Sequence, residues 1–138
     1  MSTRSTVWCE FEDENGKTFY RGSYCHFDGY LRGVGLSLFR YFEHVDWIRK
    51  VIDDGDIRSI DHQYVEHFNG GYRECSRSME TYDKNEIIEL NPQEYNYLYL
   101  ANDDKDLGKK GWKIFWNGSW KDLSDILYDE GLIRECEI

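Results

Sequence analysis

The sequence has almost no proline and no long hydrophobic run. One of its 138 residues is proline, whereas 17% are aromatic. Disordered chains are usually rich in proline and poor in aromatic residues, so this composition indicates a chain that folds around a core. No segment approaches the roughly 20 apolar residues that a membrane-spanning helix needs. Globular domains cluster at roughly 100–150 residues, and we therefore expect residues 1–138 to form one domain.

The chain is also short of basic residues. Its 17 Lys and Arg stand against 27 Asp and Glu, which gives a net charge of −10 and a pI of about 4.8. A protein that binds nucleic acid by neutralising phosphates needs a basic face, so the composition argues against that class. The excess of acid is uneven. Residues 1–50 hold 7 basic and 7 acidic residues, and residues 51–138 hold 10 basic and 20 acidic ones, so the second part carries the whole net charge.

Targeting signals and paired cysteines are absent from the sequence as well. The first residues, Met1 to Thr6, lack the apolar segment of a secretory signal peptide, so we expect a cytoplasmic protein. The four cysteines include no CxxC pair, and in a reducing compartment we expect them to be free thiols. They are Cys9, Cys25, Cys75 and Cys136.

The first part of the chain predicts a hairpin followed by two helices. Strands are expected at 6–11 and 18–27, because Asn15-Gly16 between them is a strong hairpin signal. A stripe of apolar residues at helical spacing over 34–45 predicts a helix. Asp46 is the expected N-cap of a second, short helix, and Gly55 is the residue expected to end it.

The second part predicts further strands and a last helix. Strands are expected at 62–68, 72–75, 95–100 and 112–116, and a helix at 123–127 closed by Gly131. The order of elements predicts an α+β fold, with an antiparallel sheet of about five strands packed by two to three helices on one face.

A glycine-rich loop at 24–35 is a candidate anion site. Glycines at the start of a helix can expose backbone N–H groups to a phosphate, and the chain would then bind a nucleotide signal. The candidate ligand-binding residues are His26, Asp28, Tyr30, Gly33 and Gly35, with Arg73 and Arg77 as anion ligands. No GxGxxG or GxxxxGK[ST] pattern is present, so the alternative is a turn whose glycines serve backbone geometry alone.

Metal binding and catalysis have weaker support. Zinc takes cysteine and histidine ligands, but the spacing of these residues here matches no zinc-finger signature, so ordinary buried cysteines and surface histidines are the alternative. The candidate zinc ligands are Cys25, His26, His62, His67 and Cys75. The acidic run 53–56 lacks the ligand order of an EF-hand. No motif nominates a reaction, so we expect a protein without enzymatic activity.

Carboxylates and tryptophans gather toward the carboxyl terminus. Such a surface can occupy a basic nucleic-acid channel by complementary charge, with aromatic side chains as anchors. The candidate partner-binding residues are Asp103, Asp104, Asp106, Trp112, Trp116 and Trp120. Further carboxylates lie at Asp122, Asp125, Asp129, Glu130, Glu135 and Glu137. The alternative is a solvated acidic face that maintains solubility.

Several motifs resemble a family of small uncharacterised bacteriophage and prophage proteins. They are Ser2-Thr3-Arg4-Ser5, then Tyr24-Cys25-His26-Phe27-Asp28-Gly29-Tyr30 with Gly33-Val34-Gly35, and, further on, 55–60, 72–77, 95–99 and 120–123. The usual family motif is Cys-His-Trp-Asp-Gly-Tyr, so Phe27 departs from it, and Leu31-Arg32 stands where a proline-containing pair is common. The resemblance implies a phage origin and a related fold, but no reaction.

Charge and resemblance together give the leading hypothesis. The chain would be a phage accessory protein that inhibits a host defence factor, of anti-CRISPR or anti-restriction type, by blocking nucleic-acid loading. Its partner would be a host protein such as a Cas effector or a restriction enzyme, with no direct contact to nucleic acid or membrane. A nucleotide-binding domain and a zinc-stabilised interaction module are the alternatives.

Overall fold

The sheet begins with the hairpin that the sequence predicts. The computed structural model describes residues 3–68, 79–101 and 111–138. Strands β1 (Ser5–Glu12) and β2 (Thr18–Cys25) pair antiparallel along their whole length. In the turn between them, the Asp13 carboxylate accepts the backbone N–H groups of Asn15 and Lys17 at 2.9 and 2.8 Å. Gly16 there has a φ of +78°, which glycine adopts without a steric cost.

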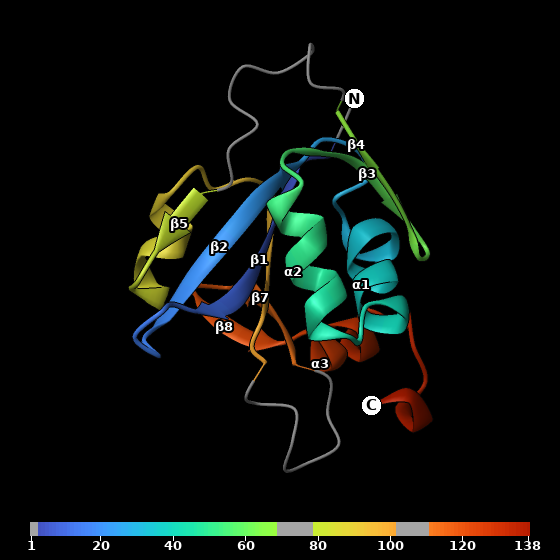
Figure 1. Ribbon diagram of the computed structural model, residues 1–138. Coiled ribbons are helices and arrows are strands. Elements are labelled where there is room, and N and C mark those ends of the chain that lie inside the picture. The colour runs from blue at the N-terminus through green and yellow to red at the C-terminus, as the bar shows by residue number, and fades with distance from the viewer. Residues whose placement is uncertain (1–2, 69–78, 102–110) are drawn as a thin grey trace.

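Strand β1 lies near the middle of one mixed sheet. The described strands follow the order β4-β3-β2-β1-β6-β7-β8, and β5 pairs separately with β2 (Figure 1). The further strands are β3 (Ile57–Asp61), β4 (Tyr64–His67), β5 (Met79–Thr81), β6 (Tyr95–Tyr99), β7 (Trp112–Trp116) and β8 (Ser119–Asp122). The α+β class is confirmed, but the sheet has eight described strands where about five were expected.

The expectation of an antiparallel sheet is wrong at its centre. β1 pairs with β6 in parallel, and β2 meets β3 in parallel at one residue pair. Local alternation of side chains cannot reveal pairing between strands that are far apart in sequence. The strand expected at 62–68 is shorter, because His62, with a φ of +56°, lies in the turn that joins β3 to β4. The strand expected at 72–75 lies outside the described residues.

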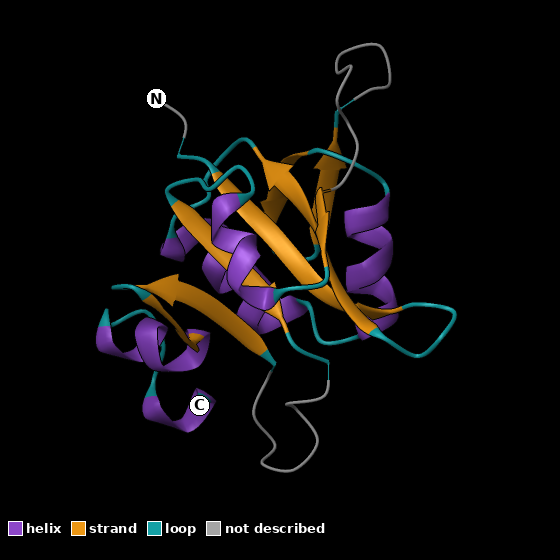
Figure 2. Ribbon diagram, turned by 90° about the vertical axis from the view of Figure 1, so that its left-hand side faces the viewer, coloured by secondary structure: helices purple, strands orange, loops and turns teal. Residues whose placement is uncertain are grey.

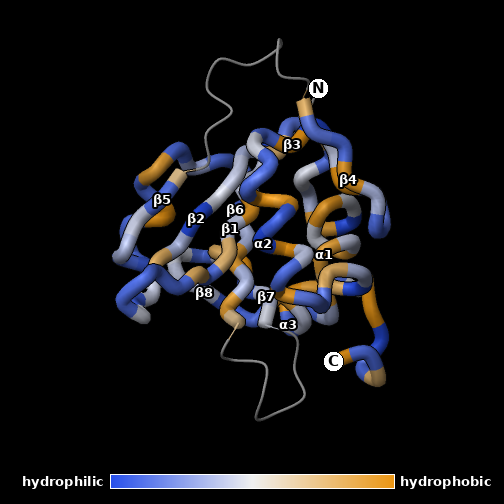
Figure 3. The backbone as a smooth tube through the Cα atoms, viewed as in Figure 1, coloured by the Kyte–Doolittle hydropathy of each residue, from blue (hydrophilic) through white to orange (hydrophobic). Residues whose placement is uncertain are grey.

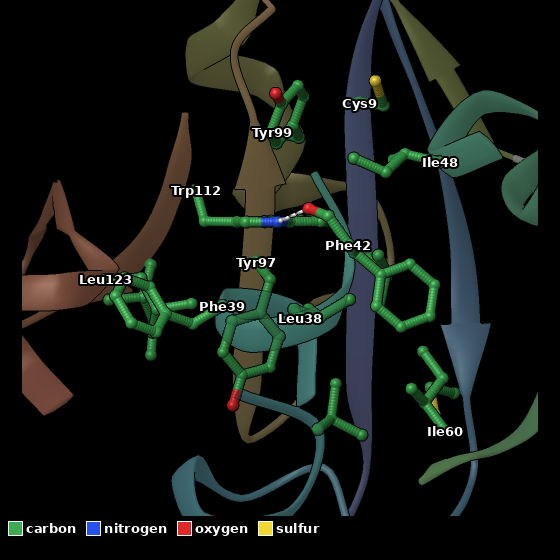
Figure 4. Packing of buried hydrophobic residues seen from close by; sticks show 14 of the residues in the cluster. Cys9, Leu38, Phe39, Phe42, Ile48, Ile60, Tyr97, Tyr99, Trp112 and Leu123 are labelled. Carbon is green, nitrogen blue, oxygen red and sulfur yellow. Dashed lines mark hydrogen bonds between the residues drawn. The ribbon is translucent and has the colours of Figure 1, made fainter. Parts of the chain in front are cut away.

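The helix expected over 34–45 is divided. A wide helical turn, η1 (Leu31–Gly35), leads into α1 (Leu36–Tyr41), and the chain leaves helical geometry at Phe42, whose φ and ψ are −110° and 84°. The side chain of Phe42 is buried, and its carbonyl accepts the indole N–H of Trp112 at 2.9 Å (Figure 4). The carbonyls at the end of a helix lack intrahelical partners, and this hydrogen bond supplies one for Phe42. The apolar spacing over 34–45 predicted that the helix would continue past this residue.

The other helices follow the sequence more closely. Helix α2 (Val45–Asp53) begins after His44, so Asp46 lies in its first turn and is not the predicted N-cap. Gly55 has a φ of +103° after the end of α2, and Gly131 a φ of +75° after α3, as expected for residues that end a helix. The remaining helical segments are α3 (Leu123–Asp129) and the 3₁₀ turns η2 (Lys84–Glu89) and η3 (Glu135–Glu137).

The two faces of the sheet are covered differently. Helices α1, α2 and α3 pack on the face that presents Val7, Cys9 and Tyr97. A smaller core on the opposite face joins Trp8 and Leu98 to η2, so helical segments lie on both sides of the strands (Figure 2). Hydrophobic and hydrophilic residues are interspersed along α1 and α2 (Figure 3), and hydrophobic residues of both helices pack in the larger core. Within the described part, no helix is long and apolar enough to cross a membrane.

The indole of Trp8 fixes the centre of the sheet. Trp8 is fully buried and lies opposite Gly22 of β2 on one side and Leu98 of β6 on the other. A Cβ atom added at Gly22 would lie 2.3 Å from Cδ2 of this ring, closer than any real contact. The indole N–H donates to the Thr6 hydroxyl at 3.0 Å, and that hydroxyl donates to the Asn96 side-chain oxygen at 2.7 Å. Packing and hydrogen bonds therefore set the register of three strands at once.

Replacing Gly22 by Ala should destabilise the protein strongly. The added methyl group must displace the Trp8 ring, and overpacking of this kind costs about 1–3 kcal/mol. Urea unfolding should show a lower midpoint with an unchanged slope. In a Trp8→Leu background, which removes the ring, the same Gly22→Ala change should cost much less. An equal cost in both backgrounds would show that the ring does not dictate glycine at this position.

Candidate functional site

The glycine-rich loop at 24–35 uses its backbone donors within the protein. The N–H of Gly29 donates to the Thr3 carbonyl at 2.8 Å, and those of Gly33 and Gly35 donate to the Tyr30 carbonyl at 3.0 and 3.3 Å. The N–H of Val34 donates to the Asp28 carbonyl at 2.8 Å. A phosphate bound at a helix start needs such donors to be free, and these four are occupied.

Close packing explains the glycines of this loop. A Cβ atom at Gly33 would lie 2.3 Å from the Asp28 carbonyl oxygen, and one at Gly29 would lie 2.7 Å from Cβ of Ser5. Beneath the loop, the buried Tyr97 hydroxyl donates to the Gly29 carbonyl at 2.7 Å. The geometry therefore favours the structural alternative for these glycines over an anion-binding loop.

The other described residues of the nucleotide hypothesis are Asp28, Tyr30 and His26. Asp28 is exposed in a left-handed turn with a φ of +56°, and Tyr30 is partly exposed. The His26 ring contacts Phe27 and Phe68 edge-on, and its Nδ1 lies 2.7 Å from the Tyr24 hydroxyl. The anion ligands Arg73 and Arg77 lie outside the described residues.

The candidate zinc ligands have separate partners. His62 Nδ1 lies 2.7 Å from the Asp61 carboxylate at the β3–β4 turn, and His67 Nε2 donates to the Val51 carbonyl at 2.7 Å. Across the described ranges, no three histidine, cysteine or acidic side chains come together as a metal-binding group. Cys75 lies outside those ranges, and Cys25 is buried beside the Phe27 carbonyl, at 3.7 Å from its oxygen.

Burial also governs the chemistry of the two core thiols. Desolvation raises the pKa of Cys25 from 9.0 to about 12 and that of Cys9 to about 12. The thiolate is the form that binds metal or attacks an electrophile, so both thiols are inert near neutral pH. Cys136 is exposed near the carboxyl terminus.

The three tryptophans of the predicted partner surface separate into two groups. Trp112 is 1% exposed and packs edge-on against Tyr99, so it belongs to the core and cannot anchor a partner (Figure 4). The prediction of an exposed aromatic at this position is wrong, because alternation along β7 places Trp112 on the face covered by the helices. Trp116 and Trp120 are half-buried at the end of the β7–β8 hairpin.

Trp116 and Trp120 line an open groove beside the last strand of the sheet. The groove has a volume of about 720 Å³ and lies between the β7–β8 hairpin, α3 and η2. Its walls are mixed in character: two indoles, three lysines and three aspartates stand beside Leu100, Asn117 and Ile126. The charged residues are Lys84, Lys113, Lys121, Asp122, Asp125 and Asp129. This groove is the candidate functional site.

The charges in the groove are partly matched. Lys113 forms an ion pair with Asp122 across the β7–β8 pair, and both side chains are largely buried. Asp125 and Asp129 are exposed one turn apart on α3, and neither forms an ion pair with any residue that the structure describes. Like charges at this spacing repel, so this wall of the groove favours a cation. The predicted contact residues Asp103, Asp104 and Asp106 lie outside the described residues.

The sequence pattern singles out Trp120 and Asp122 but does not predict the strand β8 that carries them. Asn117 and Gly118 have φ values of +50° and +89°, which is the two-residue turn that joins closely paired strands. The Asn-Gly pair followed by Ser119 and Trp120 was a usable hairpin signal. Lys84 was also missed, because its place in the groove depends on how η2 packs, which no local pattern encodes.

Substitution should separate the core tryptophan from the groove tryptophans. Trp112→Phe removes the N–H that satisfies the Phe42 carbonyl, and an unsatisfied buried acceptor costs about 1–3 kcal/mol. Trp116→Phe is the matched control, with no hydrogen bond of its indole found among the described residues, and should lower the free energy of unfolding by less. Urea unfolding of both variants measures the difference, and equal losses would contradict the assignment of Trp112 to the core.

The thiols should differ in reactivity by their burial. In native protein at pH 8, iodoacetamide should modify Cys136 and leave Cys9 and Cys25 unmodified, because burial holds the two core thiols protonated. At a pH of about 10 ordinary thiols are converted to thiolates. This pH is still below the raised pKa values of Cys9 and Cys25, so both should remain protonated and unreactive. Peptide mapping by mass spectrometry identifies the modified residues, and rapid labelling of Cys25 in the folded protein would contradict its burial.

Comparison with protein-family models, with curated proteins and with solved structures finds no match for this chain. A function inferred for it must come from the residues and from the geometry of the described segments. The groove between the β7–β8 hairpin, α3 and η2 brings two indoles and six charged side chains of those segments together.

Proposed function

We propose that this chain is a phage-encoded accessory protein that inhibits a host defence factor in the bacterial cytoplasm. It has no enzymatic activity in this proposal. It binds a basic nucleic-acid-binding surface of its partner, such as a Cas effector or a restriction enzyme, and thereby blocks nucleic-acid loading. Its own contact surface is α3 together with the groove tryptophans Trp116 and Trp120.

The placement of charge carries the proposal. Several basic side chains of the described part are neutralised internally, as in the ion pairs of Arg21 with Asp53 at 2.7 Å and Arg40 with Glu137 at 3.2 Å. The exposed carboxylates of Asp125, Asp129 and Glu130 have no ion pair with a described residue. These three carboxylates leave negative charge, unpaired within the described residues, on the exposed side of α3 and just after it, where it can face a partner.

An acidic surface of this kind competes with nucleic acid for the same basic groove. Complementary charge accelerates encounter and fixes orientation, and salt weakens both effects. Indole side chains at the edge of the charged surface supply the apolar contact that charge alone lacks. The resemblance of the sequence motifs to phage proteins supports a host defence factor as the partner.

The two alternative functions gain no such support. Nucleotide binding by the 24–35 loop would need free backbone donors, and those of Gly29, Gly33, Val34 and Gly35 are bonded within the protein. A zinc module would need its ligands to converge, and the described candidates have separate partners. The acidic surface is therefore the better basis for a function.

Neutralising carboxylates at the end of α3 should weaken inhibition. The Asp129→Asn/Glu130→Gln variant removes two charges near the negative end of the helix dipole, so it should not destabilise the helix. Its matched control, Glu12→Gln/Glu14→Gln, removes two exposed charges beside the β1–β2 turn. Against purified Cas effectors and restriction enzymes at ~50 mM salt, where screening is weakest, the first variant should bind about tenfold more weakly than wild type.

The control variant should bind like wild type, because its charges lie on another part of the surface. Target DNA should compete with wild-type protein for the enzyme, and rising salt should weaken binding. Failure of wild-type protein to bind any enzyme of the panel at ~50 mM salt, or equal weakening by both double variants, would contradict the proposal.

A further inference from the structure

Strand β8 forms one edge of the sheet within the described residues. Among the described strands, β8 pairs with β7 alone and is the last strand of the order. In a hairpin with a two-residue turn, the residues that flank the turn exchange hydrogen bonds, and the pairing then alternates. Trp116 and Ser119 flank this turn, so the backbone N–H and C=O of Trp120 point away from β7. An open edge of this kind can pair with an added strand.

The groove runs along this open edge. Trp120, Lys121 and Asp122 of β8 all line it, and its volume of about 720 Å³ leaves room beside the strand. Four residues of β8 span about 13 Å at the rise of an extended chain. The space is therefore suited to a short extended segment rather than to a helix.

An added strand would meet different side chains on its two faces. On the face covered by α3 it would meet the carboxylates of Asp125 and Asp129 together with the Trp116 ring. On the opposite face it would meet the Trp120 ring, which packs edge-on against Phe115. Successive side chains of a strand point to opposite faces. Odd and even positions of a bound segment would therefore contact chemically different walls of the groove.

The charges of the groove determine which face of a bound segment should carry basic side chains. Asp125 and Asp129 offer two carboxylates one turn apart, against the single charge of Lys121 on the same face. The opposite face holds Lys84, while the charge of Lys113 is offset by Asp122. A basic side chain is therefore favoured toward α3 and disfavoured toward η2, where an apolar side chain can cover the indole.

We propose that the open edge of β8 binds an extended segment of the partner by strand addition, with basic side chains at alternate positions facing Asp125 and Asp129 and apolar side chains between them facing Trp120. This rests on the proposed function, because the segment is the part of a basic nucleic-acid-binding surface that the inhibitor captures. A second copy of the chain is a poorer occupant, since each copy carries a net charge of −10.

A designed peptide tests strand addition without any enzyme. The probe is a capped peptide of about six residues that alternates Arg and Val, which matches the period of two along a strand. Two further peptides carry N-methyl groups on all Arg residues or on all Val residues. In an added strand, either the Arg residues or the Val residues point their N–H groups toward β8. Methylation of that set should weaken binding at least about tenfold, whereas the peptide methylated on the other set should bind like the parent. Attraction by charge alone predicts that both bind equally.

Backbone amide shifts of the full-length protein report where the parent peptide binds. Shifts should move at 119–122 and along α3 and remain unchanged in the 24–35 loop. Asp125→Asn/Asp129→Asn should weaken binding about three- to tenfold, whereas the control Glu12→Gln/Glu14→Gln should not. No saturable shift up to about 1 mM peptide, equal binding of both methylated peptides, or equal effects of the two double variants would overturn strand addition.

The peptide and enzyme experiments fail independently. A peptide that binds β8 as described, in a protein that binds no defence enzyme, would keep the edge site and remove the proposed partner. An enzyme that binds through Asp129 and Glu130, with no shift at β8 on addition of peptide, would keep the proposed function and overturn strand addition.

Discussion

The packing of Trp8 against Gly22 is the constraint on which the rest of the sheet depends. The buried indole of Trp8 lies over Gly22 of β2, where a Cβ atom has no room, so it restricts the register of β1 with β2. Leu98 of β6 lies opposite Trp8 on the other side. The hydrogen bonds through Thr6 and Asn96 then tie β1 to β6 in parallel. Once β6 is fixed, the β7–β8 hairpin follows at the sheet edge, and α3 comes back beside it to form the groove.

Sequence reasoning succeeded where the signal is local. The β1–β2 hairpin, the end of α2 at Gly55 and the end of α3 at Gly131 each follow from residues within a few positions of one another. It failed where a distant residue decides the outcome. The helix ends before Phe42, whose carbonyl accepts the indole N–H of the distant Trp112, and β1 pairs in parallel with β6, which lies far along the chain.

The same distinction applies to the candidate site. Trp116 and Trp120 were predicted as partner contacts from composition, and both line the groove, but Trp112 was placed with them although its side chain is in the core. The glycines of the 24–35 loop formed the most conspicuous motif, yet their N–H groups are bonded internally. The cluster of glycines is thus explained by tight packing over Tyr97. The candidate site lies instead beside the short strand β8.

Amide hydrogen exchange at the β8 edge tests the account most directly. In the free protein the outward-facing N–H of Trp120 should exchange much faster than that of Lys121, which faces β7. Addition of the alternating Arg-Val peptide should slow exchange at Trp120 and leave Lys121 unchanged. Equal protection of the two amides in the free protein, or exchange at Trp120 that the bound peptide does not alter, would contradict an open edge that captures an extended partner.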